Sequence, residues 1–359
     1  MNQTLAEISK AGVSVWLDDL SRARLANGSL QKLIEEDCVV GVTTNPSIFN
    51  AAIGNSDLYV ADINKYRDLG VDEIITELTC SDVSAACDLF MPVYKQSNHQ
   101  NGRISIEVDP RFAHDTNSTV SQGVSLWRKI NKPNLMIKVP ATKEGLPAIT
   151  SLISQGISVN VTLIFSVNRY REVLQAYVDG LKLAHKNGIA LNQIFSVASF
   201  FISRIDTEVD KVLPSDSALR GTAAIANAIM AYHAFTEFIE SAQWQELERF
   251  GANLQRPLWA STGVKDPAYD PTRYVMQLVA PNTVNTMPEG TLKAVRENGV
   301  FAGDTISGNY QNAKSTLAKL AITGIDLDKI TSHLEDDGVI KFESAWLELI
   351  DSVKTVAGK

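Results

Sequence analysis

The sequence Asn134–Ala141, NLMIKVPA, decides the fold because it places one lysine inside an apolar strand. Three apolar residues precede Lys138, and Val139 follows it. A strand that is apolar at both alternating positions is typical of a parallel sheet whose two faces are both covered. Pro140 cannot donate a hydrogen bond to the sheet, so it predicts the end of the strand. We therefore expect Lys138 near the carboxyl end of a buried parallel strand.

A lysine in this position has a chemical interpretation and a structural one. Burial disfavours the charged ammonium, so we expect the pKa of Lys138 to fall. An amine that is neutral near pH 7 attacks carbonyl carbon and forms a Schiff base. The structural alternative is that the side chain extends to solvent or pairs with a carboxylate. The other strands of the sequence bear on this choice.

Seven further segments have strand patterns, and helical patterns separate most of them. The expected strands are 13–19, 38–47, 103–109, 134–141, 158–166, 194–202, 256–262 and 282–287. Strands that alternate with helices indicate βα units and a parallel sheet. Eight such units most simply close into an α/β fold of the (β/α)8 barrel type, also called a TIM barrel. An open doubly wound sheet is the alternative architecture.

The whole chain, 1–359, is expected to form a single barrel domain with additional helices. Residues 48–98 contain about three helical segments and no clear strand, which predicts a helical insertion or an extended crossover. Residues 326–359 are expected to form a C-terminal helical extension. Within it, one face of Lys341–Thr355 is apolar, and we expect it to pack on the barrel or on a second subunit.

Composition limits the classes of partner. The net charge of −8 predicts no broad basic surface, so nucleic acid and anionic membranes are not expected to bind. The chain has three cysteines without paired spacing, no N-terminal apolar signal core and no apolar run of about 18 residues, which favours a cytoplasmic protein. Motifs for metals, dinucleotides and the P-loop are absent, so we expect no cofactor and no metal. A monomer and a homodimer both remain open.

Polar residues occur where the predicted strands end, and in a barrel these ends form one mouth. Each residue alone has a structural explanation, such as a helix cap or a turn. Together they are harder to explain structurally, because burying so many polar groups lowers stability. The residues at the predicted strand ends are Asp18, Asp19, Thr43, Thr44, Asn45, Ser105, Glu107, Asp109, Lys138, Asn160, Thr162, Ser199 and Ser261.

This set fits an aldol reaction through a Schiff base, in which a carboxylate accepts the hydroxyl proton and a water takes part in imine formation and hydrolysis. Two cations follow strands six and seven, namely Arg204 and Lys265, and Ser261 lies between them in sequence. They are candidates for a phosphate site. The alternative for Arg204 is that it begins a helix and pairs with Glu208.

Several segments in a fixed order make the chain resemble the transaldolase family over nearly its whole length. These segments are VWLDD, GVTTNPSIFNAA, IEVD, NLMIKVPAT, NVTLIFS, SFFISR, LWASTGVKDPAY and VNTMP. The chain length and the LWASTGVKDPAY segment are similar to the longer bacterial branch of that family. The resemblance implies transfer of a dihydroxyacetone unit from sedoheptulose 7-phosphate to glyceraldehyde 3-phosphate, in the non-oxidative pentose phosphate pathway. The implied products are erythrose 4-phosphate and fructose 6-phosphate, with no cofactor.

The resemblance also implies roles for individual residues. Lys138 is similar to the Schiff-base lysine and Asp18 to the acid–base aspartate. The implied water-positioning pair is Glu107 and Thr162. Substrate-binding residues are implied at Thr43, Asn45, Asn160, Ser199 and Phe201, and phosphate-binding residues at Arg204, Ser261 and Lys265. Many family members have an arginine where this chain has Gly263, so Lys265 is inferred to substitute for it.

Two alternatives accompany this interpretation. Fructose 6-phosphate aldolases have similar signatures but are shorter, with Gln at the position of Glu107 and Tyr at that of Phe201, so both positions favour transaldolase. The second alternative is a phosphosugar-binding barrel without turnover. Loss of Lys138 or Asp18 would indicate it, and both residues are present.

Overall fold

The computed structural model describes residues 2–54 and 56–358, and it confirms the predicted barrel. Eight parallel strands pair in sequence order, and the last strand pairs with the first to close the sheet. The strands are β1 Val13–Leu17, β2 Val39–Val42, β3 Arg103–Glu107, β4 Leu135–Pro140, β5 Val159–Ile164, β6 Ser196–Phe201, β7 Gln255–Ala260 and β8 Thr283–Met287. The open doubly wound sheet is therefore excluded.

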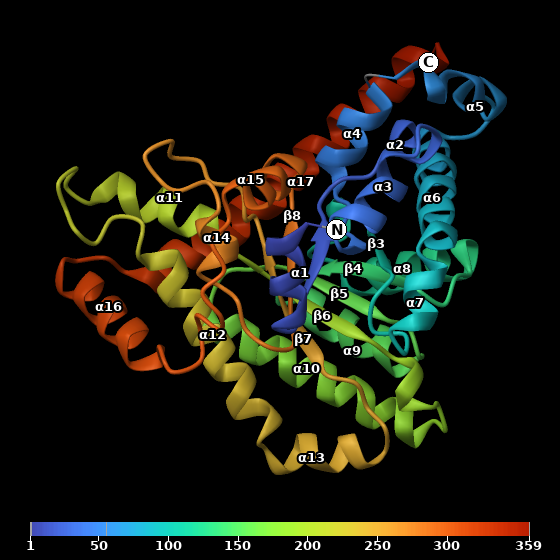
Figure 1. The fold of residues 1–359 in the computed structure, drawn as a ribbon. Coiled ribbons are helices and arrows are strands. Elements are labelled where there is room, and N and C mark those ends of the chain that lie inside the picture. Colours follow the sequence, from blue (N-terminus) through green and yellow to red (C-terminus); the bar gives the residue numbers. More distant parts are fainter. Residues whose placement is uncertain (1, 55, 359) are drawn as a thin grey trace.

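Helices surround this barrel and fill the connections between its strands (Figure 1). The α-helices of the described residues are α1 Gln3–Lys10, α2 Arg22–Ala26, α3 Ser29–Glu36, α4 Pro46–Gly54, α5 Val60–Lys65, α6 Val71–Leu89, α7 Met91–Gln96, α8 Thr116–Ile130, α9 Gly145–Ser154, α10 Val167–Lys186, α11 Ser203–Val212, α12 Ala223–Ile239, α13 Ala242–Arg249, α14 Arg273–Met276, α15 Glu289–Asn298, α16 Tyr310–Ile322 and α17 Leu327–Ala357. No helix among them is long and apolar enough to cross a membrane.

The register of the barrel explains why the lysine strand is buried on both faces. All six residues of β4 are buried, as the apolar run predicted. Lys138 pairs with Glu107 of β3 on one side and with Asn160 of β5 on the other. Residues at alternating positions of a strand share one face. The neighbours Ile137 and Val139 therefore face the outer helices, while Lys138 faces the barrel interior.

The second strand is shorter than the predicted segment 38–47. It ends at Val42, and Pro46 begins α4 at once. Proline has the backbone angle of a first helical residue and needs no partner for its nitrogen there. The side chain of Asn45 accepts a hydrogen bond from the Ile48 amide at 3.0 Å and caps the helix. The end of this segment is thus a loop and a helix start.

Residues 48–98 lie in the connection from β2 to β3. The sequence indicated about three helical segments, and the structure has four α-helices, α4 to α7, with a short 3-10 turn at Asp57–Tyr59. No strand occurs among the described residues of this connection.

The sequence pattern of 217–242 predicts one continuous helix, and this prediction is wrong in its extent. Residues 217–222 form turns, in which Asp210 accepts a hydrogen bond from the Gly221 amide at 2.9 Å. The helix α12 begins only at Ala223. Near its other end, the Ser241 side chain caps a separate helix, α13, by accepting from the Trp244 amide. Local hydrogen bonds of this kind compete with a continuous helix and divide it in two.

Two buried arginines fill the amino end of the barrel. Arg256 donates to Ser14 Oγ at 2.8 Å and to the Gln100 carbonyl at 3.1 Å. Arg103 donates to the carbonyl of His99 through Nε at 3.0 Å. Burial lowers the pKa of Arg256 to about 10 and that of Arg103 to about 9. Bonded side chains thus fill this end.

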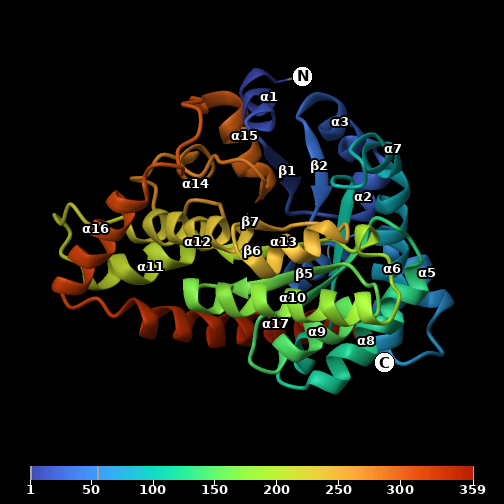
Figure 2. The same ribbon diagram turned by 90° about the horizontal axis from the view of Figure 1, so that it is seen from below.

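The helix α17 covers the opposite, carboxyl end. It has 31 residues and packs against α4, α5, α6 and α11 and against the end of β5. In Figure 1 it runs diagonally beside α4, with the chain end near α5. Figure 2 shows the same helix as a long rod along one edge of the molecule. Of the two packing alternatives that the sequence left open for 341–355, the structure has this apolar face packed within the same chain.

The packing of α17 predicts that substitutions at two of its leucines lower the stability of the protein by very different amounts. Leu349 is fully buried and Leu347 is 52% exposed. Replacing Leu349 by Ala should lower the free energy of unfolding by about 2–5 kcal/mol, since the lost contacts leave a cavity. The control Leu347→Ala should change it by less than about 0.5 kcal/mol. Urea unfolding followed by circular dichroism measures both, and equal effects would contradict the packing described.

Candidate active site

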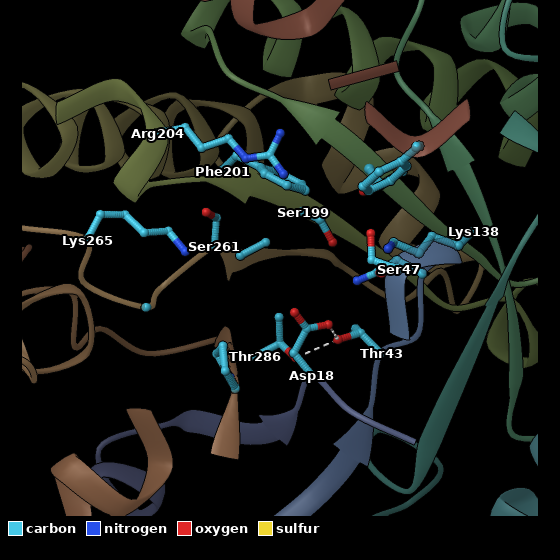
Figure 3. Close-up of a pocket in the computed structure, with 16 residues that line it drawn as sticks. Asp18, Thr43, Ser47, Lys138, Ser199, Phe201, Arg204, Ser261, Lys265 and Thr286 are labelled. Carbon is cyan, nitrogen blue, oxygen red and sulfur yellow. Dashed lines mark hydrogen bonds between the residues drawn. The ribbon is translucent and has the colours of Figure 1, made fainter. Parts of the chain in front are cut away.

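A cavity of about 220 Å³ opens at the carboxyl ends of the strands. Figure 3 shows that its side chains come from several strands and the loops after them, with Lys138 at one end and Arg204 and Lys265 at the other. The resemblance implied roles for twelve residues, and ten of them line this cavity, namely Asp18, Thr43, Asn45, Lys138, Thr162, Ser199, Phe201, Arg204, Ser261 and Lys265. Glu107 and Asn160 lie behind this lining, bonded to residues of it.

The amine of Lys138 is held inside the protein by two acceptors. Its Nζ donates to the Thr44 carbonyl at 2.9 Å and to Glu107 Oε2 at 3.0 Å. Its side chain is only 5% exposed. Of the two structural alternatives, extension into solvent is therefore wrong, whereas pairing with a carboxylate is present. Because the amine also lines the cavity, the pairing leaves it accessible to a ligand there.

Glu107 shares this buried position, and its protonation is shifted. Burial raises the pKa of the Glu107 carboxyl to about 7, while the positive charge and hydrogen bond of Lys138 oppose the rise. The side chain is 4% exposed. A carboxyl group with a pKa near 7 can both accept and release a proton at neutral pH.

Asp18 faces the cavity from the end of β1. Its Oδ1 accepts a hydrogen bond from the Thr43 hydroxyl at 2.7 Å. The same Thr43 oxygen lies 2.7 Å from Thr286 Oγ1. A hydroxyl has one proton, so Thr286 must donate to Thr43 and Thr43 to Asp18. Among the described residues no donor bonds the second carboxylate oxygen, Oδ2, which leaves it available to a ligand.

Burial raises the pKa of Asp18, and the charge of Lys138 together with the Thr43 hydrogen bond opposes that rise. Its neighbour Asp19 differs in position. Asp19 Oδ2 lies 2.6 Å from Arg24 Nη2, on a side chain that is one-third exposed. The sequence could not distinguish the two aspartates by pattern alone. Only Asp18 reaches the cavity.

A chain of hydrogen bonds crosses the barrel below the cavity. Ser199 donates to Asn160 Oδ1 at 2.7 Å, and Asn160 Nδ2 donates to Ser105 Oγ at 3.0 Å. The amide of Asn160 is thereby bonded at both of its polar atoms. Ser199 also lines the cavity, so this chain fixes part of the cavity floor.

Thr162 has an orphaned hydroxyl. Its Oγ1 is buried and finds no hydrogen-bond partner among the described residues, although it lies on the cavity wall. The next residue, Leu163, has a φ of +59°, and the pairing with β6 shifts between Val161 and Ile164. A non-glycine residue in this conformation is strained. Strain and an unsatisfied hydroxyl together point to a ligand-binding position.

The cationic end of the cavity is built from α11 and the loop after β7. Arg204, in the first turn of α11, lies with its Cζ 5.4 Å from the ring centroid of Phe201, and its buried Nη1 has no partner among the described residues. Burial lowers the pKa of Arg204, which the carboxylates of Asp337 and Asp18 oppose. The alternative partner Glu208 instead bonds Lys211 at 2.6 Å.

Ser261 and Lys265 complete this end. Ser261 has a φ of +55°, and its hydroxyl lies 2.9 Å from the Ser203 hydroxyl. Lys265 lies on the loop that follows and lines the cavity (Figure 3). Gly263 also lines it. The sequence inference that Lys265 occupies the arginine position is consistent with this placement.

Sequence reasoning missed five residues that also line the cavity, namely Ser47, Ala260, Thr286, Pro288 and Phe342. Thr286 had a signal, because it stands at the end of the eighth predicted strand. Ser47 follows the Asn-Pro turn, which also points toward the mouth. Phe342 had no such signal in the sequence, because it lies on α17, far from any predicted strand. No cluster of three or more metal-ligating side chains occurs within residues 2–54 and 56–358.

Known proteins resemble this chain over nearly its full length. The family model described as Transaldolase/Fructose-6-phosphate aldolase matches residues 15–353. A protein named Transaldolase from Mycolicibacterium smegmatis is 54% identical over 360 residues, covering 98% of this chain and 97% of its own. Transaldolase 1 of Streptomyces avermitilis is 53% identical over 361 residues, covering 98% and 95%. A Transaldolase from Mycobacterium tuberculosis is 52% identical over 98% of this chain. The chain therefore belongs to the transaldolase/fructose-6-phosphate aldolase family.

Proposed function

We propose that this chain transfers a dihydroxyacetone unit from sedoheptulose 7-phosphate to glyceraldehyde 3-phosphate, as a transaldolase. The observation that carries the proposal is that one cavity is lined by the buried amine of Lys138, the carboxylate of Asp18 and the cations Arg204 and Lys265. Glu107 holds the amine from behind this lining. The names of the relatives, at 52–54% identity, support the same activity.

The reaction begins at Lys138. Its amine adds to the ketose carbonyl at C2, water leaves, and an iminium ion forms. The iminium accepts the electron pair of the C3–C4 bond as that bond breaks, which gives an enamine on the lysine. Asp18 takes the proton of the C4 hydroxyl through its free Oδ2, and the aldehyde product leaves. The same steps in reverse, with the acceptor aldehyde, return the proton to the new hydroxyl.

Glu107 and Thr162 are proposed to hold the water that forms and breaks the imine. Glu107 contacts the lysine nitrogen directly, and its pKa of about 7 suits proton exchange at neutral pH. The orphaned Thr162 hydroxyl offers a donor or an acceptor on the cavity wall. A water between the two would satisfy both groups.

The remaining predicted residues are proposed to bind substrate. Arg204, Ser261 and Lys265 hold the phosphate group at the cationic end, where the unpaired Nη1 of Arg204 is ready to donate. Thr43, Asn45, Asn160, Ser199 and Phe201 shape the region between the phosphate and the amine. Asn160 acts through Ser199, because it lies behind the cavity lining and accepts a hydrogen bond from that serine. We also propose a cytoplasmic protein, in which the buried thiols of Cys38, Cys80 and Cys87 stay reduced.

Borohydride trapping tests the Schiff base. Incubation with fructose 6-phosphate and borohydride should add one reduced dihydroxyacetone unit to Lys138, because the reduced imine cannot hydrolyse. Peptide mass mapping locates the adduct. Lys138→Ala should give no adduct. Asp18→Asn should still be trapped but turn over about 10²–10⁴-fold more slowly. An adduct at another lysine would exclude the assignment.

The pKa of Glu107 predicts the acid limb of the pH profile. The carboxylate is the form that accepts a proton, and burial raises its pKa from that of an ordinary glutamate to about 7. Activity should therefore fall about tenfold per pH unit below about pH 7. In Glu107→Gln, most of the activity should be lost. The activity that remains should no longer show the acid limb of the pH profile. The measurement is kcat/KM for the donor across the neutral range. A wild-type limb located near the ordinary glutamate pKa would contradict the role.

Removing Lys265 tests the phosphate site. Lys265→Ala should raise KM for fructose 6-phosphate about tenfold to 100-fold, since a charge-assisted hydrogen bond is lost. The unphosphorylated ketose should be affected less, because it never makes that bond. Lys211→Ala, at a surface lysine bonded to Glu208, is the matched control and should change neither constant. An equal rise in KM for both ketoses would contradict the assignment of Lys265 to the phosphate site.

A further inference from the structure

An aromatic ring from the C-terminal helix forms part of the cavity wall next to the reactive amine. Phe342 lines the cavity and is 5% exposed. Its ring centroid lies 5.5 Å from Lys138 Nζ. Among the described residues, that nitrogen also donates hydrogen bonds to the Thr44 carbonyl and the Glu107 carboxylate. The amine is thus enclosed by two oxygen acceptors, one ring and the cavity.

A glycine determines how closely α17 approaches the barrel. A Cβ atom at Gly338 would lie 3.0 Å from Leu163 Cδ2 and 3.6 Å from Phe165 Cε2. The glycine therefore lets the helix rest on the end of β5, at the strained residue beside Thr162. Residues four apart share one face of a helix. Phe342 is four residues after Gly338, so this contact sets the position of the ring over Lys138.

Contacts on both sides of this point fix the helix. Toward its start, Arg169 of α10 bonds the two carboxylate oxygens of Glu335 at 3.1 Å each. Toward its end, Asn50 of α4 donates to Glu348 at 2.9 Å. These partners belong to helices that follow β5 and β2. The ring of Phe342 is consequently held in place by the barrel.

The ring faces a nitrogen that carries positive charge as an iminium during the proposed reaction. An aromatic face within about 6 Å of a cation stabilises it. The ring also occupies space from which water would otherwise reach the nitrogen and C2. Both effects act on the covalent intermediate, and neither requires contact with the phosphate end.

We propose that Phe342 is a specificity-determining residue, which protects the dihydroxyacetone intermediate on Lys138 from water until an acceptor aldehyde binds. The inference rests on the proposed function, because it presupposes that intermediate. It goes further by giving the C-terminal helix a part in the choice between transfer and release.

Two reactions compete for the enamine. In transfer, C3 attacks the carbonyl carbon of the acceptor aldehyde, and the proton of Asp18 goes to the new alkoxide. In release, C3 takes a proton from solvent to give an iminium, water adds to C2, and the C2–N bond breaks. Release yields free dihydroxyacetone and the free amine. Both reactions then hydrolyse an iminium, so water exclusion acts selectively at the stage before the acceptor arrives.

A purely structural role for Phe342 makes a different prediction. If the ring only packs the helix, its loss lowers stability and leaves the ratio of release to transfer unchanged. Val353 supplies the matched control, because it is fully buried on the same helix and does not line the cavity.

The test supplies sedoheptulose 7-phosphate as donor and glyceraldehyde 3-phosphate as acceptor. It measures the free dihydroxyacetone released and the fructose 6-phosphate formed, in parallel with borohydride trapping. Phe342→Ala should raise the ratio of release to transfer at least about fivefold while Lys138 is still trapped. Gly338→Val should act in the same direction, because the added side chain displaces α17 with the ring intact. Val353→Ala should keep the wild-type ratio.

A wild-type ratio in folded Phe342→Ala would overturn the inference and leave the proposed function standing. The same holds if Val353→Ala raises the ratio equally. If Phe342→Ala does not fold, Gly338→Val decides on the same criterion. Failure to trap any adduct on wild-type Lys138 would instead reject the proposed function itself.

Discussion

The contact between Lys138 Nζ and Glu107 Oε2, at 3.0 Å, constrains much of this protein. Two ionisable groups taken out of water are costly unless they pair with good geometry, and removing one partner of a buried pair costs about 3–5 kcal/mol. The barrel supplies this geometry through the pairing of β3 with β4, in which the two residues stand side by side. A shift of one of these strands by one residue would turn its side chain to the outer face of the barrel and separate the pair. The register of β3 against β4 therefore also fixes where the amine lies relative to the carboxylate.

The rest of the cavity combines satisfied and unsatisfied polar groups. Asp18 and Ser199 are held by bonds to Thr43 and Asn160, which fix their positions. By contrast, the hydroxyl of Thr162 and one guanidinium nitrogen of Arg204 are buried without partners among the described residues. Unpaired buried groups lower stability, so natural proteins rarely retain them without a function. The fixed groups set the geometry, and in the proposed function the unpaired ones are where a ligand contributes its own atoms.

The sequence predicted those features that depend on residue type along one strand. A lysine in an apolar run and acids at strand ends stand out by chemistry, and the parallel barrel follows from eight βα units. Features set by packing between distant segments were not predictable. The strand pattern alone did not distinguish Asp18 from Asp19; the family resemblance indicated Asp18, and in the structure Asp19 pairs with Arg24 while Asp18 lines the cavity. The bonding of Asn160 depends on residues of two other strands, β3 and β6. The place of Phe342 depends on how closely Gly338 approaches Leu163.

The position of α17 at the end of the chain has a consequence for synthesis. Strand β8 ends at Met287, so every strand of the barrel is made about 40 residues before α17 begins at Leu327 and about 55 residues before Phe342. A nascent chain can thus close its sheet while the amine is still uncovered on the side of Phe342. The cavity therefore gains this part of its wall only after Phe342 has been made, and a product that ends before α17 has the sequence of all eight strands but lacks this aromatic ring.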